Sequence, residues 1–213
     1  MAAPRGRFIT LEGGEGAGKS THASRLAAWL NERGVAVRQT REPGGSPRAE
    51  AIRELLLSGR VAPFGAEAEA LLFAVARADH MEEIVRPALR RGEWVISDRF
   101  MDSTRAYQGA AGVADEVLDR LERLAVGADR PDLTLIFDLP ADEGLARAGA
   151  RGAVADRFEE EALSVHERRR AAYLTIAARE PGRCVVVDAR PEVDVVGRAV
   201  REAVSDRLGA FLP

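Results

Sequence analysis

A short stretch near the start of the chain has the residue types and spacing of a phosphate-binding loop. It reads Gly13, Gly14, Glu15, Gly16, Ala17, Gly18, Lys19 and Ser20, followed by Thr21. Glycines let backbone N–H groups turn toward an anion, and a helix that begins there adds the positive end of its dipole. A glycine-rich turn without a ligand is the alternative. The stretch predicts a nucleoside triphosphate site in which Ser20 contacts Mg²⁺, but it does not name the phosphate acceptor.

Lys19 is the single lysine among the 31 basic residues of the chain. A compact ammonium on a flexible stem fits between the β- and γ-phosphates, whereas a planar guanidinium is too wide for a loop closed around them. A bias of composition toward arginine explains the other basic residues but not the position of this lysine. We therefore interpret Lys19 as a functional residue.

Two other features narrow the class of nucleotide-binding protein. GTPases normally select guanine with an Asn-Lys-x-Asp segment, which a chain with one lysine in its phosphate loop cannot contain. The segment after the second predicted strand is short, whereas many motor ATPases have long coupling elements there. A small-molecule kinase is the best remaining interpretation.

Asp98 and Arg99 follow an apolar run and are expected at the tip of a strand. A carboxylate there can hold Mg²⁺ directly or through water, or it can cap the next helix. Arg99 can grip the phosphate of an acceptor with two parallel hydrogen bonds, or it can form a surface salt bridge. Asp98 and Arg99 could therefore bring the metal ion and the phosphate of the acceptor together at one edge of the predicted sheet.

Two pairs of residues have the spacing that places two side chains on the same face of a helix. Phe73 and Arg77 are four residues apart, so the ring could stack on a base while the guanidinium reaches a base carbonyl. An isolated phenylalanine at this spacing more often belongs to the core. Thr104 and Gln108 are also four apart.

Short apolar, β-branched runs alternate with helical periodicity along the whole chain, which predicts an α/β, three-layer P-loop fold. We expect one domain, residues 1–213, with a five-stranded parallel sheet, helices on both faces and a small lid at about 141–157. The predicted strands are 7–11, 35–41, 93–97, 133–138 and 183–188. The predicted helices are 19–33, 48–58, 66–91, 114–126, 158–179 and 191–208. Ligands of such folds bind beyond the carboxyl ends of the strands.

The composition is that of an ordinary globular chain, with 46% hydrophobic residues and a formal net charge of -3. This charge does not indicate nucleic-acid binding. The chain contains no apolar run of the roughly 18–20 residues that span a bilayer. Its single cysteine, Cys184, excludes an intrachain disulfide and is expected to be a buried structural thiol rather than a nucleophile. We expect a cytoplasmic protein that binds neither nucleic acid nor membrane.

Several segments together resemble the thymidylate kinase family. They are the loop with the preceding Leu-Glu-Gly, residues 41–47 (Arg-Glu-Pro-Gly-Gly-Ser-Pro), residues 71–77, and residues 97–109 with their DR-x₃-S-x₃-YQG pattern. The resemblance extends from about residue 7 to 189. It implies transfer of the γ-phosphate of ATP to dTMP, giving dTDP and ADP, with Mg²⁺ and in a homodimer. A kinase for another pyrimidine monophosphate, or a nucleotide-binding protein without turnover, is the alternative.

The resemblance also implies roles for individual residues. Phe73 matches the aromatic residue that stacks on the base, and Arg77 the arginine that contacts it. Thr104 and Gln108 match positions that face the polar edge of thymine. The remaining matches are Arg99 with the acceptor phosphate, Tyr107 with the sugar, Glu15 with the 3′-hydroxyl, Arg41 with phosphate, and Pro43 and Ser103 with the substrate. The peptide bond before Pro43 is expected to be cis.

Arginines interleaved with glycine and alanine between residues 146 and 157 are typical of a flap that closes over phosphates. An ordinary exposed loop is the alternative. Some family members carry a basic residue in the phosphate loop where this chain has Gly16, so the resemblance implies a catalytic arginine from the lid. Arg151 is the first candidate, followed by Arg147 and Arg157. The run 168–170 is expected to face solvent and to pair with residues Glu159–Glu161 or the surrounding glutamates.

Overall fold

The computed structural model describes residues 5–150 and 157–212. These residues form a five-stranded, entirely parallel sheet with the order β2-β3-β1-β4-β5. The strands are β1 (Phe8–Gly13), β2 (Val37–Arg41), β3 (Trp94–Asp98), β4 (Leu133–Asp138) and β5 (Cys184–Asp188). All five predicted strands are confirmed, and so is the α/β fold class.

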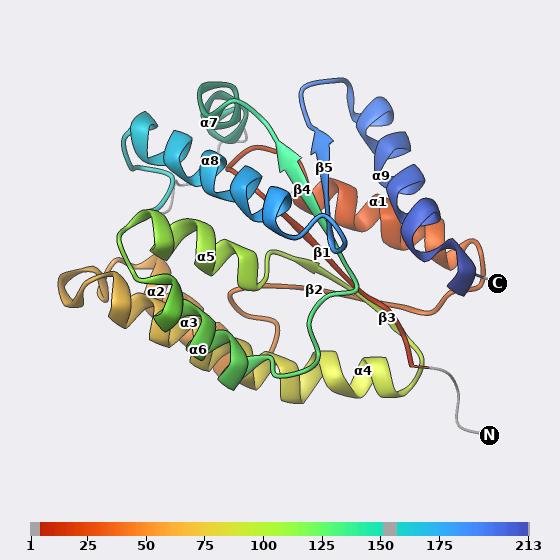
Figure 1. The fold of residues 1–213 in the computed structure, drawn as a ribbon, viewed down its shortest axis with the longest axis horizontal. Coiled ribbons are helices and arrows are strands. Elements are labelled where there is room, and N and C mark those ends of the chain that lie inside the picture. Colours follow the sequence, from red (N-terminus) through yellow and green to blue (C-terminus); the bar gives the residue numbers. More distant parts are fainter. Residues whose placement is uncertain (1–4, 151–156, 213) are drawn as a thin grey trace.

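Helices cover both faces of the sheet. Figure 1 shows α1 (Lys19–Asn31) and α9 (Val193–Leu208) on one side, and α3 (Ala66–His80), α5 (Met101–Ala110) and α8 (Leu163–Arg179) on the other. The remaining helices are α2 (Pro47–Leu57), α4 (Arg86–Arg90), α6 (Asp115–Ala125) and α7 (Ala141–Gly149). Short helical turns occupy Ala62–Phe64 (η1), Met81–Val85 (η2) and Gly209–Phe211 (η3).

The central strand β1 shows why both faces must be covered. Its side chains alternate between two cores, as the twofold period of a strand requires. Ile9 and Leu11 pack in the cluster that contains α1 and α9, whereas Phe8 packs in the cluster that contains α3 and α4. Every residue of β1 is buried, so the near-continuous apolar run reflects a sheet without a solvent-facing side.

The predicted helix 66–91 is interrupted. It consists of α3, the π-helical turn η2 and α4. Pro87 has no N–H to donate to the carbonyl four residues earlier, and the hydrogen-bond spacing widens in the turn just before it. The direction of the chain is kept, so the side chains of α3 still face the sheet.

Two helices were not predicted, and one prediction began too early. The helix α5 has only ten residues, half of them polar or charged, so it contains few apolar residues that could mark it as a helix. The helix α7 occupies the first part of the predicted lid, which was expected to be a loop. The helix predicted from residue 158 begins at Leu163, after a turn that includes Phe158.

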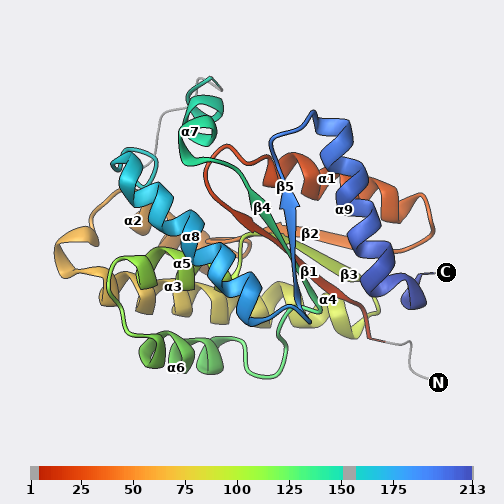
Figure 2. The same cartoon turned by 45° about the horizontal axis from the view of Figure 1, so that its top comes forward.

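The parallel strands bring their carboxyl ends to one edge, where the phosphate loop follows β1 and Arg99 follows β3. Figure 2 shows α7 beyond the end of β4, next to α8. Within residues 5–150 and 157–212, no helix combines the length and apolar character needed to cross a membrane.

Candidate active site

A cleft of about 290 Å³ lies at this edge of the sheet. It joins the phosphate loop to α3 and α5. The predicted site residues that line it are Glu15, Gly16, Ala17, Gly18, Lys19, Ser20, Thr21, Arg41, Pro43, Phe73, Arg77, Asp98, Arg99, Ser103, Thr104, Tyr107 and Gln108. The tertiary structure therefore brings residues from five separate segments of the sequence into one cavity.

The phosphate loop has the backbone that its glycines permit. Gly16 and Gly18 have φ values of 66° and 86°, in the left-handed region that side chains disfavour. A β-carbon on Gly16 would also lie 2.0 Å from the Gly144 carbonyl oxygen of α7, so only glycine fits there. The loop is thus packed directly against the beginning of the predicted lid.

Lys19 is buried, and its Nζ donates a hydrogen bond to the Gly14 carbonyl oxygen at 2.6 Å. Burial, together with the charge of Arg99, lowers the pKa of Lys19 to about 8. Both effects disfavour the ammonium and would be relieved by negative charge nearby. Gly13 and Gly14 do not line the cleft, but their carbonyl oxygens hold Arg99 and Lys19.

Ser20 and Asp98 lie together at the cleft, where the Ser20 hydroxyl donates a hydrogen bond to Asp98 Oδ2. The expected alternative for Asp98, capping of the next helix, does not apply, because α5 begins at Met101 without a side-chain cap among the described residues. Two hard oxygen donors fit Mg²⁺, which usually takes one or two protein ligands and completes its shell with water and substrate phosphates.

Glu15 and Arg99 form an ion pair that closes one side of the cleft. Arg99 Nη2 lies 2.6 Å from Glu15 Oε1, and the Tyr107 hydroxyl donates to the same oxygen at 2.6 Å. Burial opposes ionisation of Glu15, but the charges of Arg99 and Lys19 outweigh it and lower its pKa to about 2. This carboxylate is therefore ionised at neutral pH and holds both side chains in place.

The backbone of Arg99 is strained. With φ of 68°, it is the only non-glycine residue of the described ranges in the left-handed region. Its N–H donates to the Leu11 carbonyl oxygen at 2.9 Å, which fixes the turn after β3. Such strain costs of order 1–3 kcal/mol and persists where the surroundings determine the conformation. The turn aims the guanidinium into the cleft.

Glu12, near the end of β1, stabilises the turn after β3 through hydrogen bonds. It is fully buried and accepts hydrogen bonds from Phe100 N at 2.8 Å and from Ser103 Oγ at 2.6 Å. Burial, and then the charge of Asp102, raises its pKa to about 7. The sequence offered no signal for this role, because a polar residue at the end of a buried strand has many possible partners.

On the opposite wall, Phe73 and Arg77 lie on α3 and both line the cleft, so they share one face of the helix as their spacing predicted. Arg77 Nη2 donates to Thr104 Oγ1 on α5 at 3.0 Å. Gln108 Nε2 lies 3.4 Å from Glu69, and Gln108 Oε1 is buried without a hydrogen bond to the described residues. A donor and an acceptor are therefore available at this end of the cleft.

The loop after β2 forms the rim. The Glu42–Pro43 peptide bond is cis, as expected. Arg41 is exposed and its Nη2 lies 3.0 and 3.1 Å from the two carboxylate oxygens of Glu50. Arg53 Nη1 donates to the Pro43 carbonyl oxygen at 2.8 Å. Arg41 thus lies at the mouth of the cleft with its guanidinium already paired.

The two predicted lid arginines that the structure describes, Arg147 and Arg157, do not line the cleft. Arg147 donates to the backbone carbonyl oxygens of Ala189 and Arg190 at 2.8 and 3.0 Å. Arg157 pairs with Glu69 at 2.5 Å, and its guanidinium lies 4.4 Å from the Phe158 ring. Arg151 lies outside the described residues.

The arginine run 168–170 was expected to face solvent, and for Arg169 this is wrong. Arg169 is buried, with its guanidinium 4.1 Å from the centre of the Tyr107 ring. The expected pairing is confirmed, because Arg169 is bonded to Glu161. Arg170 binds Asp138 through two hydrogen bonds. A buried guanidinium is accepted here because the ring and the carboxylate replace water.

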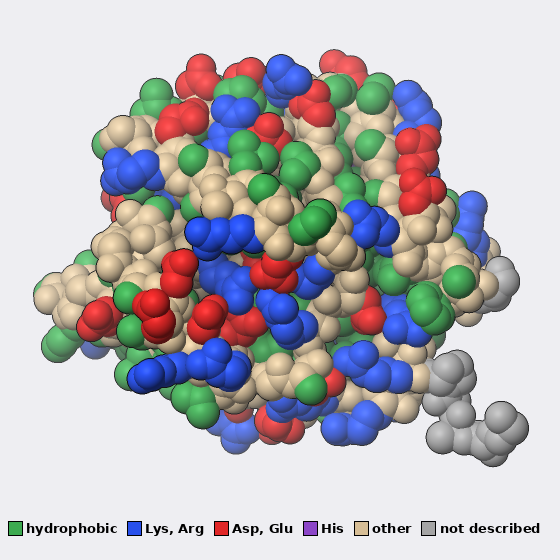
Figure 3. All heavy atoms as spheres, in the orientation of Figure 1, with side chains coloured by type: hydrophobic (Ala, Val, Ile, Leu, Met, Phe, Trp, Pro, Cys, Tyr) green, Lys and Arg blue, Asp and Glu red, His purple; other side chains and the backbone are tan. Residues whose placement is uncertain are grey.

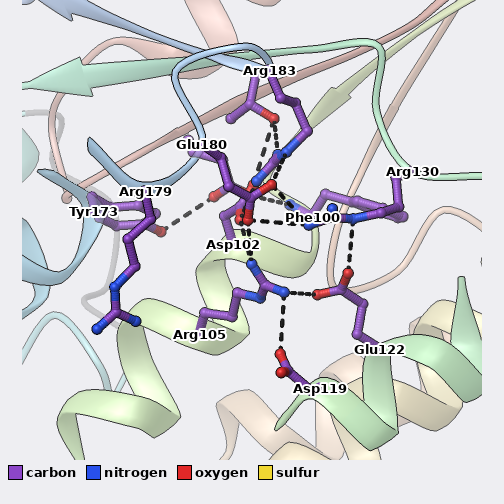
Figure 4. A network of polar contacts seen from close by, with 12 residues as sticks. Phe100, Asp102, Arg105, Asp119, Glu122, Arg130, Tyr173, Arg179, Glu180 and Arg183 are labelled. Atoms are coloured by element: carbon purple, nitrogen blue, oxygen red, sulfur yellow. Dashed lines mark hydrogen bonds and ion pairs between the residues drawn. The ribbon is translucent and has the colours of Figure 1, made fainter. Parts of the chain in front are cut away.

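The side of α5 that faces away from the cleft is held by a network of ion pairs (Figure 4). Asp102, fully buried, accepts two hydrogen bonds from Arg183 at 2.7 and 2.9 Å. Arg105 lies 2.8 Å from Glu122 and 2.7 Å from Glu180. Figure 3 shows acidic and basic side chains side by side over this region, between α5 and α8. The network anchors the helix that carries Thr104, Tyr107 and Gln108.

Sequence reasoning did not single out several residues that line the cleft. They are Glu42, Arg53, Leu57, Phe100, Phe158 and Glu159. Glu42 and Phe100 lie inside the recognised segments and could have been found there. Arg53, Leu57 and Phe158 had no signal, because they come from helix or turn positions whose side chains resemble ordinary surface or core residues.

Comparisons with known proteins agree with this geometry. The family model described as thymidylate kinase matches residues 11–200. A thymidylate kinase of Bradyrhizobium sp. (strain ORS 278) is 54% identical over 96% of this chain and 92% of its own length. That of Caulobacter vibrioides is 55% identical, with 96% and 99% covered.

A crystal structure of thymidylate kinase from Ehrlichia chaffeensis, 32% identical, superposes with a TM-score of 0.77 and covers 94% of this chain and all of that one. Residues 11–200, which the family model matches, include the phosphate loop and both walls of the cleft. With a family model and full-length relatives in agreement, the chain belongs to the thymidylate kinase family.

Proposed function

We propose that this protein transfers the γ-phosphate of ATP to dTMP, giving dTDP and ADP for DNA precursor synthesis. The observation that carries the proposal is the continuity of the cleft. Lys19, Arg99, Phe73 and Arg77 all line this one cleft. A phosphate donor and a nucleotide acceptor bound in this cleft would meet at Arg99. Family membership supports the same reaction.

The donor would bind at the phosphate loop. Residues 13–18 supply backbone N–H groups, Lys19 exchanges the Gly14 carbonyl oxygen for phosphate oxygens, and Thr21 adds to the start of α1. We assign Mg²⁺ to Ser20 and Asp98. When bound, the ion would neutralise charge on the donor phosphates and orient them.

The acceptor would bind between α3 and α5. Phe73 offers a ring for stacking, Arg77 a donor, and Gln108 Oε1 a buried acceptor. Tyr107 and Glu15 would face the sugar, with the ring limiting space for a ribose 2′-hydroxyl and the carboxylate accepting from the 3′-hydroxyl.

Arg99 would bind the acceptor phosphate, with Ser103 3.2 Å from its Nη1 holding it in place and Arg41 and Pro43 closing the rim. Transfer would be in line, without a covalent enzyme intermediate. The catalysis would come from positioning and from cations on the developing charge. No general base beyond the acceptor phosphate itself is needed.

We also propose that residues 1–213 act as one domain whose segment 141–157 is a lid. Its catalytic arginine would be Arg151, with Arg147 and Arg157 as the next candidates. The last two would first have to leave protein partners, the carbonyl oxygens after β5 and Glu69. The order of the three candidates is the one given by the sequence analysis.

The homodimer is a further part of the proposal. Leu71 and Val75 lie four residues apart on one face of α3 and are 53% and 48% exposed. Apolar side chains of this size on one helix face are typical of a buried interface. Light scattering after gel filtration should give twice the mass of the chain, and Leu71→Glu with Val75→Glu should give the monomer. The cytoplasmic location and the absence of nucleic-acid binding stay predictions.

One assay tests the reaction. ADP formation is followed with MgATP and a panel of nucleoside monophosphates: dTMP, dUMP, dCMP, ribothymidine monophosphate and AMP. The proposal requires dTMP to be preferred. Preference for another acceptor would replace it by a kinase of that nucleotide, and no turnover with any would favour a nucleotide-binding protein. Lys19→Arg tests the interpretation of the phosphate loop, because this variant should fold but lose most turnover.

A further inference from the structure

A chain of buried polar side chains lies behind Arg77. Arg77 Nε donates to Glu42 Oε2 at 2.7 Å, His80 Nδ1 lies 2.9 Å from Glu42 Oε1, and His80 Nε2 lies 2.7 Å from Thr40 Oγ1. Arg77 is 3% exposed, Glu42 5% and His80 0%. The chain therefore connects β2 and the loop after it to the face of α3 that borders the cleft.

These contacts determine the direction of the Arg77 guanidinium. Nε is bound to Glu42, and Nη2 donates to the Phe100 carbonyl oxygen at 3.1 Å and to Thr104 at 3.0 Å. A guanidinium is planar, so holding two of its nitrogens sets the third. Nη1 makes no hydrogen bond to the residues that the structure describes, and Arg77 lines the cleft. Nη1 is thus the donor left for a ligand.

Glu42 can hold Arg77 in this way only if its other oxygen is satisfied. A carboxylate accepts hydrogen bonds, so the His80 Nδ1 that faces it carries the hydrogen, and in the neutral ring Nε2 accepts from the Thr40 hydroxyl. Without the Nδ1–H donor, Oε1 would be a buried acceptor with no partner, which is costly. The carboxylate would then rotate or admit water, and the Arg77 guanidinium would lose its fixed plane.

The turn after β2 is built closely around the histidine. Gly45 has φ of 89°, and a β-carbon there would lie 2.7 Å from both His80 Nε2 and Thr40 Oγ1. The turn can approach the pair only because residue 45 has no side chain. His80 is therefore held from two sides, by Thr40 and by the turn, while its Nδ1 faces Glu42.

We propose that His80, acting through Glu42, is a positioning residue that aims Arg77 at the nucleobase and so contributes to the choice of base. The inference rests on the proposed function, in which Arg77 reads the acceptor base. Thr104, to which Arg77 is bonded, lies on the same wall as Gln108, so Arg77 faces the polar edge of the base. A guanidinium only donates, so it favours a carbonyl over the amino group of cytosine, which also donates.

Two histidine replacements separate this role from simple packing. His80→Asn keeps a side-chain donor near the position of Nδ1, whereas His80→Gln keeps a polar group near Nε2 and loses the donor to Glu42. His80→Gln should raise KM for dTMP about tenfold, the typical effect of one lost hydrogen bond to a charged group. Its kcat at saturating dTMP and its KM for ATP should change by less than about threefold, and its preference for dTMP over dCMP should fall about tenfold. His80→Asn should restore most of the KM and of the preference.

Arg77→Met is the reference variant, and thermal unfolding confirms that each variant is folded. Equal losses in folded His80→Asn and His80→Gln would overturn the inference, since packing alone would then explain them. Wild-type KM and preference in His80→Gln beside a clear loss in Arg77→Met would also overturn it, while leaving the proposed function intact. An unchanged Arg77→Met would instead remove Arg77 from base recognition. Should His80→Gln not fold, Thr40→Val takes its place, with a KM increase of about threefold expected and an unchanged KM counting against the inference.

Discussion

The acceptor wall of the cleft and the proposed lid segment hold their arginines differently. On the acceptor wall (α3, α5 and the turn at Arg99), Arg77 and Arg99 are each in buried ion pairs and face the cavity. In the proposed lid segment (residues 141–157), the described Arg147 and Arg157 form hydrogen bonds and an ion pair with protein groups away from the cavity. Protein groups hold the wall arginines toward the cavity, whereas the described lid arginines would have to change partners to reach it.

The chemistry of the proposed reaction explains the difference. A nucleobase keeps its charge and shape throughout phosphoryl transfer, so a rigid site binds it equally well at every stage. The transferred group develops charge only near the transition state, and a cation that arrives on closure contributes most there. The wall is therefore expected to govern KM and selectivity, and the lid segment to govern kcat.

The largest effect is expected at Arg99, on the acceptor wall. Arg99→Met should lower kcat/KM for dTMP by about 10³-fold, because a charge at the acceptor phosphate is lost. Steady-state kinetics measures this loss. Arg91→Met, at an exposed pair with Glu93, is the matched control and should retain wild-type kinetics. A loss below tenfold in folded Arg99→Met would place the acceptor phosphate elsewhere.

The lid segment is tested by Arg151→Ala. We expect kcat to fall by about 10²- to 10³-fold with KM for dTMP nearly unchanged, since the arginine is proposed to act on the developing charge. Arg147→Ala and Arg157→Ala are compared in the same kinetic assay. If one of these lowers kcat more than Arg151→Ala does, the catalytic role moves to that arginine. A rise in KM alone would show that Arg151 contributes to dTMP binding, as the acceptor wall does, and not to the transfer step.

Glu69 touches both regions, because it pairs with Arg157 at 2.5 Å and lies 3.4 Å from Gln108 Nε2. Glu69→Gln should raise KM for dTMP about three- to tenfold, as Gln108 loses its charged partner and Arg157 its anchor. The same kinetics on Glu67→Gln, an exposed position of the same helix, gives the control. A fall in kcat without a change in KM would show that Glu69 serves the lid segment alone.

The smallest effect on activity is expected behind the acceptor wall. Glu180 accepts from Arg105, Arg130 and Arg183 at 2.7, 3.0 and 2.9 Å. Burial opposes its ionisation, but the hydrogen bond and charge of Arg183 lead the effects that lower its pKa from 4.5 to about 2. Glu180→Gln should lower the free energy of unfolding by about 1–2 kcal/mol at pH 7 and change kcat by less than twofold.

The pH dependence gives this prediction its sign. A carboxyl group whose pKa is lower in the folded than in the unfolded protein stabilises the folded state. This stabilisation is complete at a pH above the pKa of the unfolded protein, and it is lost as the pH falls through the pKa of the folded protein. Urea unfolding at pH 7, 5 and 3 should therefore show the difference between wild type and Glu180→Gln shrinking below pH 4.5. Glu116→Gln, exposed on α6, should show no such trend. A difference independent of pH would contradict the ionic role.

Much of the fold could be predicted because its signals are local. Each strand is a short apolar run with a turn after it, and all five were found. The helix α5 was missed because its position depends on Arg99, Asp102 and the network behind it rather than on its own periodicity. The interruption of the helix at η2 could not be predicted without the hydrogen-bond geometry around Pro87. The lid helix α7 was missed because glycine and alanine also suit a loop.

The candidate site divides in the same way. Lys19 and Asp98 were predicted from motif spacing and from their places next to strands, and Arg99, Phe73 and Arg77 from the family resemblance. None of these predictions needs knowledge of distant partners. The buried position of Arg169 against Tyr107 was not foreseen, because a run of three arginines is typical of a solvated surface. Only packing against α5 shows which of the three is covered.

By itself, the sequence determined the strands, the phosphate loop with its single lysine, and the segments that identify the family. These properties depend on neighbours within a few residues, where backbone geometry alone relates one side chain to the next. Only the tertiary structure decided which charges are paired and which way they face. Glu42 meets His80 and Arg77 across 38 and 35 residues of chain, and Glu15 meets Arg99 across 84. Such partners depend on the packing of whole helices on the sheet, which no local pattern contains.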